Sequence, residues 1–400
     1  MNTCHICGNQ EVVDLLDLGM QPISNRFLDS PTAEEYSHPI VVGQCSACGL
    51  VQISRPVPAE ELKPLYDWIT YREPEAHLDT LADTISKLPG INRDSTIGGI
   101  SFKDDPLLER MQKLGFKNTW RLDPEIDLGI SDRRSGVETI QSHLTQGKAA
   151  SIAQTRDKAD IIIARHILEH AYNTLDFAAA LTELATPEGY IVLEVPDCER
   201  SLAKCDYTTI WEEHIIYFTP ETFRNSFSFS GLSLNHFDSF PYPFENSLVG
   251  IGQRQKSVTP TFPSDSILEN EKSRLTDFAQ GLSEQRQKLK TFFSEYRQNQ
   301  GKIALMGAGH LCCAFITFLE LDGYFEFVAD DNPNKQGLFM PSSRLPIYNS
   351  AALLENDIKL CLLSLSPDSE TKVLQNNQAF LEKGGTFASI FPASKLALKI

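Results

Sequence analysis

Two CxxC pairs near the start of the chain constrain its fold more than any other feature. Cys4 and Cys7 form the first pair, Cys45 and Cys48 form the second, and a glycine follows each pair. Two thiolates one tight turn apart can each occupy one edge of a tetrahedron, and the trailing glycine lets backbone N–H groups turn toward the sulfur atoms. The spacing therefore predicts a structural zinc ribbon with these four cysteines as ligands.

Two other interpretations of the cysteines stay open at this point. They could be four ordinary thiols, or one pair could be a redox CxxC motif. A redox motif, however, would not need a second matching pair. A closed zinc site anchors a small domain and seldom performs chemistry, so the reaction has to be sought elsewhere in the chain.

The composition excludes several classes of partner. The chain has 400 residues and a formal net charge of -17, because 36 Lys and Arg stand against 53 Asp and Glu. Cations this few and scattered cannot form a stripe that follows nucleic-acid phosphates or an anionic membrane. The N-terminus lacks the basic and apolar regions of a secretory signal, and five further cysteines follow no pairing pattern. We therefore expect a cytoplasmic protein that binds neither nucleic acid nor membranes.

Between residues 94 and 255, short apolar strands alternate with helices. Strands are predicted over residues 95–101, 119–124, 159–165 and 189–196, with helices over 106–114 and 178–184. This alternation indicates an α/β sheet with crossover connections. Ligands of such sheets bind outside the carboxyl ends of the strands. The segments to consider are therefore 99–105, Asp123, 165–170 and 194–197.

This series of elements matches the ground plan of a class I S-adenosylmethionine methyltransferase. Such a site needs a glycine turn after the first strand, where backbone approaches the methionine part, and an acid after the second strand to bind the ribose hydroxyls. Asp123 stands where that acid belongs, although a lone acid at a strand end is more often a solvated loop residue. The turn after the first strand lacks the usual GxGxG. By themselves these residues support methyl transfer only weakly.

A resemblance to one enzyme family extends over nearly the whole chain. The CxxCG and CxxCGLVQ motifs enclose Leu-Asp-Leu-Gly-Met-Gln-Pro at residues 16–22, Ala-Arg-His-Ile-Leu-Glu-His occupies 164–170, and Glu-Glu-His-Ile-Ile-Tyr-Phe occupies 212–218. The last segment is similar to an HEHxxYF signature. In this order and spacing, the motifs resemble the sugar C-methyltransferases of deoxysugar biosynthesis. Those enzymes combine a zinc-binding domain, a class I methyltransferase domain and a Rossmann-like C-terminal domain.

The resemblance implies a function and a set of site residues. The family removes a proton from the carbon beside the ketone of a nucleotide-linked 4-keto deoxysugar, and the enolate attacks the methyl group of S-adenosylmethionine. Carried over by position, His214 is the candidate base, Glu213 its acid/base neighbour and His170 a second polar group facing the sugar. A histidine that titrates near neutral pH suits such a proton transfer. The candidate cofactor-binding residues are Gly99, Ser101, Asp104, Asp123, Arg165 and His166.

The chain departs from the family pattern in several positions. Family members carry Glu-Ile-Gly-x-Asn-Asp-Gly where this chain has residues 99–105, so Ser101 and Asp105 replace two glycines and would crowd the approach of backbone to the cofactor. A tyrosine of the pattern is Trp211, and the first histidine of HEH is Glu212. Three alternatives follow: a different sugar, a different acceptor atom, or a binding or scaffold protein of the same fold that does not transfer methyl.

The C-terminal part contains a second glycine turn. A strand over residues 302–306 runs into Gly307 and Gly309, and a strand over 325–331 ends on Asp330, which resembles a dinucleotide site. Only two glycines are present, and the family resemblance accounts for the segment without NAD. We therefore prefer a domain that helps to position the nucleotide of the substrate. Strands over 358–363 and 385–390 would complete its parallel sheet.

Leucines recur every seven residues between the two predicted sheets, at positions 268, 275, 282 and 289, and Tyr296 continues the register. This pattern predicts a long amphipathic helix, either packed along its own domains or forming a coiled-coil dimer. The sequence thus predicts a zinc-binding domain at 1–75, a methyltransferase-like domain at 76–262, the helix at 263–300 and a Rossmann-like domain at 301–400. We expect a monomer, with a dimer as the alternative, that uses Zn²⁺ and S-adenosylmethionine and acts on a small-molecule nucleotide sugar.

Overall fold

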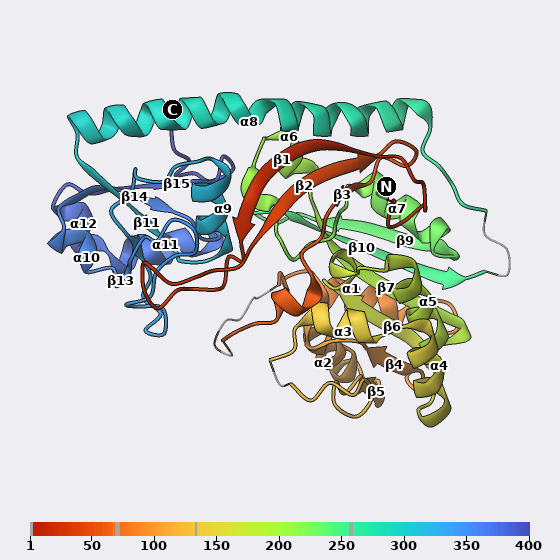
Figure 1. Cartoon of the computed structure of the whole chain (residues 1–400). Coiled ribbons are helices and arrows are strands. Elements are labelled where there is room, and N and C mark those ends of the chain that lie inside the picture. Colours follow the sequence, from red (N-terminus) through yellow and green to blue (C-terminus); the bar gives the residue numbers. More distant parts are fainter. Residues whose placement is uncertain (1–2, 67, 69–72, 133, 256–258) are drawn as a thin grey trace. The chain divides into compact units, whose positions relative to one another are not determined.

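The computed structural model describes residues 3–66, 68, 73–132, 134–255 and 259–400 (Figure 1). The chain divides into two compact units, and each combines segments that are distant in the sequence. Unit 1 comprises Met1–Asp14, Val42–Glu199 and Glu213–Lys272, and unit 2 comprises Leu15–Val41, Arg200–Glu212 and Ser273–Ile400. The division into four consecutive domains stays a prediction.

A six-stranded sheet forms the centre of unit 1. Its strand order is β5-β4-β6-β7-β10-β9, and these strands span Asn118–Arg121, Thr96–Gly99, Ala159–Arg165, Ala185–Asp197, Asn246–Arg254 and Leu232–Phe240. The first four strands run parallel, as the alternating pattern predicts. β10 pairs antiparallel with both β7 and β9, and the sequence does not predict this edge of the sheet.

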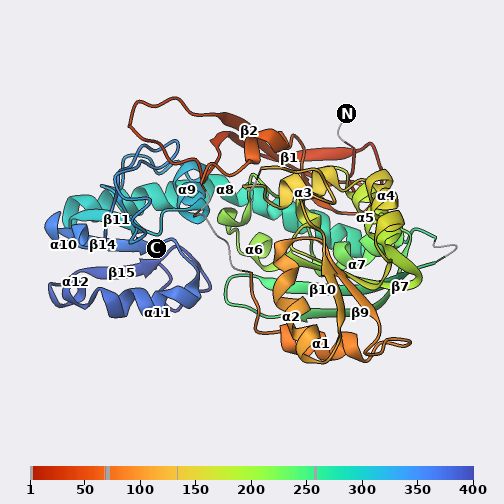
Figure 2. The ribbon, with the colours of Figure 1, turned by 90° about the horizontal axis from the view of Figure 1, so that it is seen from below.

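Helices cover both faces of this sheet because the side chains of each strand alternate between them. On β6, Ile161 and Ile163 pack with one group of helices, whereas Ile162 and Ala164 pack with the other. The first group is α1 (Leu78–Ser86) and α2 (Asp105–Lys113); the second is α3 (Val137–His143), α4 (Gln146–Thr155), α5 (Thr174–Leu184) and α7 (Pro220–Phe229). Figure 2 shows α1 and α2 on one side of the strands and α4, α5 and α7 on the other. The layers confirm the predicted α/β class.

The order of the strands fixes where a ligand can bind. β5 follows β4 on one side of the sheet, and β6, the next strand along the chain, lies on the other side of β4. The strand order therefore reverses between β4 and β6, and in sheets of this kind the ligand-binding crevice lies outside the carboxyl ends of the strands at such a point. Two short 3₁₀ helices begin there, η2 (Phe102–Asp104) after β4 and η3 (Leu168–His170) after β6.

The cysteine pairs lie in two turns next to a small antiparallel sheet. Its order is β1-β2-β3-β8, with bounds Val12–Pro22, Ser37–Cys45, Val51–Ile53 and Ile216–Tyr217. Within unit 1, β3 pairs with β2 on one side and with β8 on the other. The segment after His214 therefore belongs to the same sheet as the second cysteine pair.

The last hundred residues of unit 2 form a second α/β sheet. Its strand order is β13-β12-β11-β14-β15, with bounds Ile347–Tyr348, Val328–Ala329, Lys302–Met306, Ile358–Leu363 and Thr386–Ser389, and every pair is parallel, as predicted. β12 is shorter than the predicted strand over 325–331, although Glu326 N still donates to Ile303 O. The helices are α9 (His310–Phe318), α10 (Ala352–Glu355), α11 (Pro367–Asn376) and α12 (Gln378–Glu382).

A single helix, α8 (Asp265–Asn299), contains the predicted heptad leucines. In unit 2, Leu275, Leu282 and Leu289 are buried by the chain itself, and the Phe293 ring packs against that of Phe325. The seam therefore packs along the chain that carries it, which is the first of the two predicted alternatives. The remaining elements are η1 (Ala59–Leu62), α6 (Glu199–Ala203) and η4 (Tyr207–Thr209). Among the described residues, every helix is too short or too polar to cross a lipid bilayer.

Candidate functional site

The four cysteines of the two CxxC pairs converge at one point of unit 1. Their sulfur atoms all lie within 4.8 Å of one another, with Cys4 Sγ 3.6 Å from Cys48 Sγ and Cys7 Sγ 3.5 Å from Cys45 Sγ. A tetrahedral site with Zn–S bonds of about 2.3 Å needs sulfur atoms roughly 3.8 Å apart. Gly8 and Gly49 have positive φ angles of 72° and 77°, as the trailing glycines of such turns require. The four thiols therefore fit a structural zinc ion.

The zinc-binding turn contacts the methyltransferase core directly. The imidazole Nδ1 of His5, inside the first CxxC pair, lies 3.1 Å from the carbonyl oxygen of Tyr172. At the second pair, Ile53 N donates to Ile215 O at 2.9 Å, and Ile215 N in turn donates to Glu169 O at 2.7 Å. The ribbon is thus hydrogen-bonded to both segments that carry candidate catalytic histidines.

The turn after β4 is closed by its own side chains. The Asp104 carboxylate accepts hydrogen bonds from Ile100 N at 2.7 Å, Ser101 N at 2.8 Å and Arg165 N at 2.8 Å. The Ser101 hydroxyl accepts one from Lys103 N. Burial raises the pKa of Asp104 to about 6, although the backbone donors partly offset it. Two predicted cofactor residues, Ser101 and Asp104, are therefore fully buried and tie β4 to β6.

Gly99 ends β4, and a larger residue there would displace the Leu108 side chain. A Cβ on it would lie 2.9 Å from Leu108 Cδ1, closer than real Cβ contacts. Asp105, predicted to crowd the turn, instead begins α2 and pairs with Arg121 at 2.9 Å. The crowding at the turn comes from Ser101 and Asp104.

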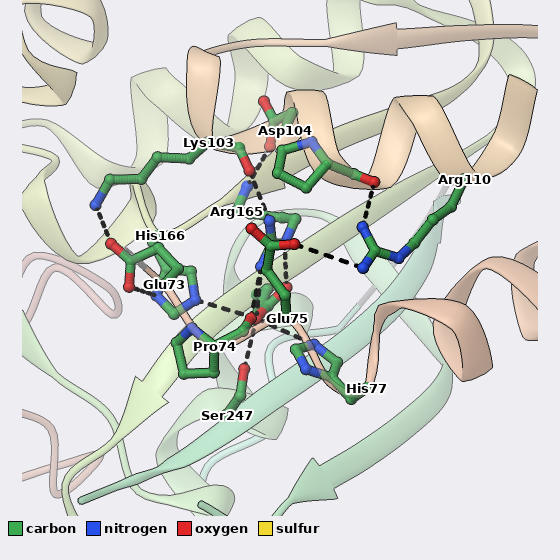
Figure 3. A network of polar contacts seen from close by, with 12 residues as sticks. Glu73, Pro74, Glu75, His77, Lys103, Asp104, Arg110, Arg165, His166 and Ser247 are labelled. Atoms are coloured by element: carbon green, nitrogen blue, oxygen red, sulfur yellow. Dashed lines mark hydrogen bonds and ion pairs between the residues drawn. The ribbon is translucent and has the colours of Figure 1, made fainter. Parts of the chain in front are cut away.

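A network of buried charges fills the carboxyl ends of β6 and β7 (Figure 3). Arg165 Nε donates to Glu194 Oε2 at 2.5 Å, and its Nη1 donates to the Lys103 carbonyl at 2.6 Å. His166 Nε2 lies 3.0 Å from Glu194 Oε1, and Lys103 Nζ lies 2.6 Å from Glu73 Oε1. The predicted residues Arg165 and His166 are thus together in one site, and both are buried.

The paired charges shift the pKa values of the network strongly. Burial by itself lowers the pKa of His166, but the Glu73 and Glu194 carboxylates outweigh it and raise that pKa to about 10. Burial raises the pKa of Glu73, but His166 and Lys103 outweigh it and lower that pKa to about 2. His166 also has a positive φ of 47°, an uncommon conformation for a histidine. The network therefore holds charged groups of both signs beside the crevice.

Asp123 stands apart from this network, at the end of β5. Its side chain is exposed, and Oδ1 accepts hydrogen bonds from Glu125 N and Ile126 N at 2.9 Å each. The position and exposure suit an acid that binds ribose hydroxyls. Charged groups of both signs lie beside β4 and β6, where the amino and carboxylate groups of a methionine moiety would bind. Together with Asp123, these residues fit S-adenosylmethionine.

His170 and His214 are brought together, as the sequence predicts. Their ring centroids lie 4.7 Å apart in an edge-to-face arrangement. Glu213 meets His170 through its backbone carbonyl, 3.0 Å from Nδ1. Two acids that the motifs did not single out complete the cluster: Glu138, whose Oε1 lies 2.9 Å from His170 Nδ1, and Glu169. Glu138 comes from α3, and nothing in its local sequence marks it.

Glu169, His170 and His214 together offer the donor atoms of a divalent metal site, within 4.8 Å of one another. Their surroundings favour proton chemistry instead. The His166 Nδ1 lies 3.6 Å from Glu169 Oε1, and the Lys103 ammonium interacts with the Glu169 and Glu138 carboxylates. Neighbouring cations disfavour the binding of a further dication.

Trp211 and Glu212, which depart from the family pattern, both contact His310 in unit 2. The Glu212 carboxylate accepts a hydrogen bond from Ser24 N at 2.6 Å and lies 3.1 Å from His310 Nδ1. The Trp211 ring stacks on His310 with centroids 3.7 Å apart. The acid that replaces the first histidine of HEH is therefore a buried member of a structural cluster.

The Asp330 carboxylate closes the C-terminal glycine turn through hydrogen bonds, as Asp104 closes the turn after β4. Asp330 Oδ2 accepts hydrogen bonds from Ala308 N at 2.9 Å and Lys335 Nζ at 3.0 Å, and Oδ1 accepts one from Asn332 N at 2.9 Å. The carboxylate closes the turn, so it is not presented to a ribose. This geometry disfavours the dinucleotide interpretation.

Family models match most of the chain. A zinc-binding domain matches residues 4–62, a methyltransferase domain matches residues 99–236, and a C-methyltransferase C-terminal domain matches residues 255–392. Among characterised proteins, the C-methyltransferase NovU of Streptomyces niveus is 22% identical over 412 residues, which cover 99% of this chain and 97% of the relative.

Solved methyltransferase structures match more weakly. The Burkholderia thailandensis 1,6-didemethyltoxoflavin-N1-methyltransferase, with bound 1,6-didemethyltoxoflavin and S-adenosylhomocysteine, covers 46% of this chain and 80% of its own at 11% identity, with a TM-score of 0.30. An S-adenosylmethionine-dependent methyltransferase from Clostridium acetobutylicum covers 44% and 90% at 10% identity, with a TM-score of 0.30. Likeness at this level carries no argument about function.

Zinc and S-adenosylmethionine are the cofactors of this architecture, and the residues described above fit both. The three domains follow one another in the order that the sequence motifs indicated, and a C-methyltransferase is similar over its full length. The chain is therefore an S-adenosylmethionine-dependent methyltransferase that combines a zinc-binding domain, a methyltransferase domain and a C-methyltransferase C-terminal domain in this order.

Proposed function

We propose that the enzyme methylates a carbon beside the ketone of a nucleotide-linked deoxysugar, through an enolate. The observation that supports this most is the pair His170 and His214, ring against ring with a carboxylate on either side, at the strand ends where such folds bind ligands. Bound S-adenosylmethionine supplies the methyl group. Enolate chemistry needs a base at the carbon and a polar group at the ketone oxygen, and two imidazoles can provide both.

In this proposal His214 removes the proton from the carbon beside the ketone. The C–H electron pair becomes the enolate, and the proton resides on the His214 imidazole. His170 faces the sugar as the second polar group, and Glu213 orients the pair; its carbonyl already holds His170 Nδ1. Asp123 binds the ribose of the cofactor, and Gly99, Ser101, Asp104, Arg165 and His166 shape the rest of its site.

The setting of the reaction is also part of the proposal. The substrate is a small nucleotide sugar, and the enzyme works in the cytoplasm. The cysteines are consistent with a reducing compartment, since none of those in the described residues forms a disulfide.

One experiment tests the proposal by measuring both methyl transfer and deuterium exchange at the acceptor carbon. The zinc-loaded enzyme is incubated in deuterated water with dTDP- or UDP-linked 4-keto deoxysugars, with and without labelled S-adenosylmethionine. We expect methyl transfer to carbon, and deuterium uptake at that carbon when the cofactor is omitted. His214→Asn should reduce both by about 10²- to 10⁴-fold, the usual contribution of a general base.

A matched control is His236→Asn, on the edge strand β9, where the ring pairs with Asp238. It should retain both activities. Methylation on oxygen or nitrogen, or a fully active His214→Asn enzyme, would contradict the proposal.

A further inference from the structure

The His170 imidazole is fixed on one side by two acceptors. Its Nδ1 lies 2.9 Å from Glu138 Oε1 and 3.0 Å from Glu213 O. A carboxylate and a carbonyl can only accept hydrogen bonds, so Nδ1 must carry the proton. In the neutral ring the lone pair then lies on Nε2, and in the charged ring Nε2 carries the second proton.

The other side of the ring faces the cluster. His170 is 3% exposed, and its Nε2 makes no hydrogen bond with any described residue; the nearest acid, Glu169 Oε1, is 4.0 Å away. Glu169 is 1% exposed, and its Oε2 likewise has no partner among the described residues. Buried polar atoms are nearly always satisfied, so these two atoms mark where a substrate group would bind.

Glu138 is built to hold this position. It is 6% exposed, and although burial raises its pKa, the charge and hydrogen bond of His170 outweigh that and hold the pKa below its ordinary value. The side chain folds back over the start of α3, so a Cβ on Gly136 would lie 2.5 Å from Glu138 Oε2. Gly136 therefore leaves room for the carboxylate.

We propose that Glu138 is the positioning residue of the site: it fixes the Nδ1–H tautomer of His170, so that Nε2 is the atom through which His170 exchanges protons. A proton that arrives adds to the Nε2 lone pair and gives an imidazolium, which Glu138 stabilises without changing its own protonation. The same proton leaves from Nε2. The identity of the donor rests on the proposed function, but the tautomer does not.

Other ionisable groups lie next to the ring. Glu169 precedes it on η3, and His214 packs against it with ring centroids 4.7 Å apart. Lys103 and His166 add positive charge beyond Glu169. Among the described residues, only the Glu138 carboxylate and the Glu213 carbonyl lie within hydrogen-bond distance of His170 Nδ1.

The experiment is two-bond ¹H–¹⁵N NMR of the zinc-loaded enzyme labelled at histidine, with the His170 signals assigned from His170→Asn. We expect the neutral ring to be entirely the Nδ1–H tautomer. Glu138→Gln retains an acceptor oxygen and should keep that tautomer, whereas Glu138→Leu should give a mixture of both. Gly136→Ala displaces the Glu138 carboxylate without removing it, so its spectrum should also show a mixture of the two tautomers, as for Glu138→Leu.

Kinetic measurements distinguish a positioning role of Glu138 in catalysis from a role in protein stability alone. Glu138→Leu should lower kcat by about 10- to 100-fold with little change in KM and should change the pH profile, whereas Glu138→Gln should change the pH profile with a smaller loss of rate. An Nε2–H tautomer in the wild type, or an unchanged tautomer in both Glu138→Leu and Gly136→Ala, would overturn the proposal. If the tautomer is as expected but no keto sugar is methylated, the proposed function fails and this inference stands.

Discussion

At the scale of single residues, the site is defined by charges that are buried in pairs. Glu194 is the centre: Arg165, His166 and Ser247 all donate to its carboxylate, and it is fully buried. A buried charge without a partner is costly, so removal of one member leaves the others uncompensated. The network therefore gives the protein a pH dependence that can be measured.

His166 contributes to that dependence at alkaline pH. Its pKa is raised from 6.5 to about 10, so its stabilisation is complete below about pH 6.5 and is lost as the pH rises through 10. Glu73, with its pKa lowered from 4.5 to about 2, contributes above pH 4.5 and ceases to do so as the pH falls through 2. Stability from these two residues is therefore greatest between about pH 4.5 and 6.5.

We predict that the wild-type free energy of unfolding falls by on the order of a few kcal/mol between pH 7 and 10, and that His166→Gln removes most of this fall. Denaturant unfolding at several pH values measures it, with His236→Gln as the surface control. Parallel curves for wild type and His166→Gln would refute the assigned role of His166.

At the scale of elements, the zinc ribbon supports the two segments that carry His170 and His214. β3 pairs with β8, just after His214, and His5 holds the carbonyl of Tyr172, two residues after His170. A metal that folds the ribbon therefore also orders both histidine segments. Zinc contributes to the reaction through structure, and its four thiol ligands leave no open position for a substrate.

Loss of the metal should therefore be detected at the histidines. Cys45→Ser should lose the zinc, and amide exchange at Ile215 and Tyr172 should become at least about tenfold faster because their segments lose a fixed neighbour. Cys205→Ser, outside the CxxC pairs, should keep the zinc and the slow exchange. Zinc analysis with hydrogen exchange by mass spectrometry makes the comparison. Unchanged exchange in metal-free Cys45→Ser would mean that the ribbon does not support the site.

At the scale of the whole molecule, patterns within one strand or turn were the predictable part. β6 and β14 match their predicted bounds, because each is an almost uninterrupted apolar run. The CxxC pairs are equally local. β9 was missed because a bulge opposite Ile251 and Gly252 shifts its register, so that apolar alternation changes phase between Leu234 and Phe237.

The site was predictable only where a motif carries it. His170 and His214 stand in recognisable segments, and Glu194 falls in the segment 194–197 that the strand pattern indicated. Glu138 on α3 and Glu73 before α1 were not predicted, because a lone glutamate has no local signature. Glu212 shows the same limit, since its partner His310 is 98 residues away. Contacts of this kind depend on how the elements pack, and one sequence does not reveal them.

We expect this chain to bind S-adenosylmethionine through Asp123, although the turn after β4 is closed by Asp104. Titration calorimetry of the zinc-loaded protein tests it most directly, with Asp123→Asn, which keeps the Oδ1 acceptor of the local turn, and Glu125→Gln as the neighbouring control. We predict micromolar binding by the wild type and the control, and about 10- to 100-fold weaker binding by Asp123→Asn, the cost of a charged hydrogen bond. No binding by the folded wild type, or equal binding by Asp123→Asn, would contradict the account.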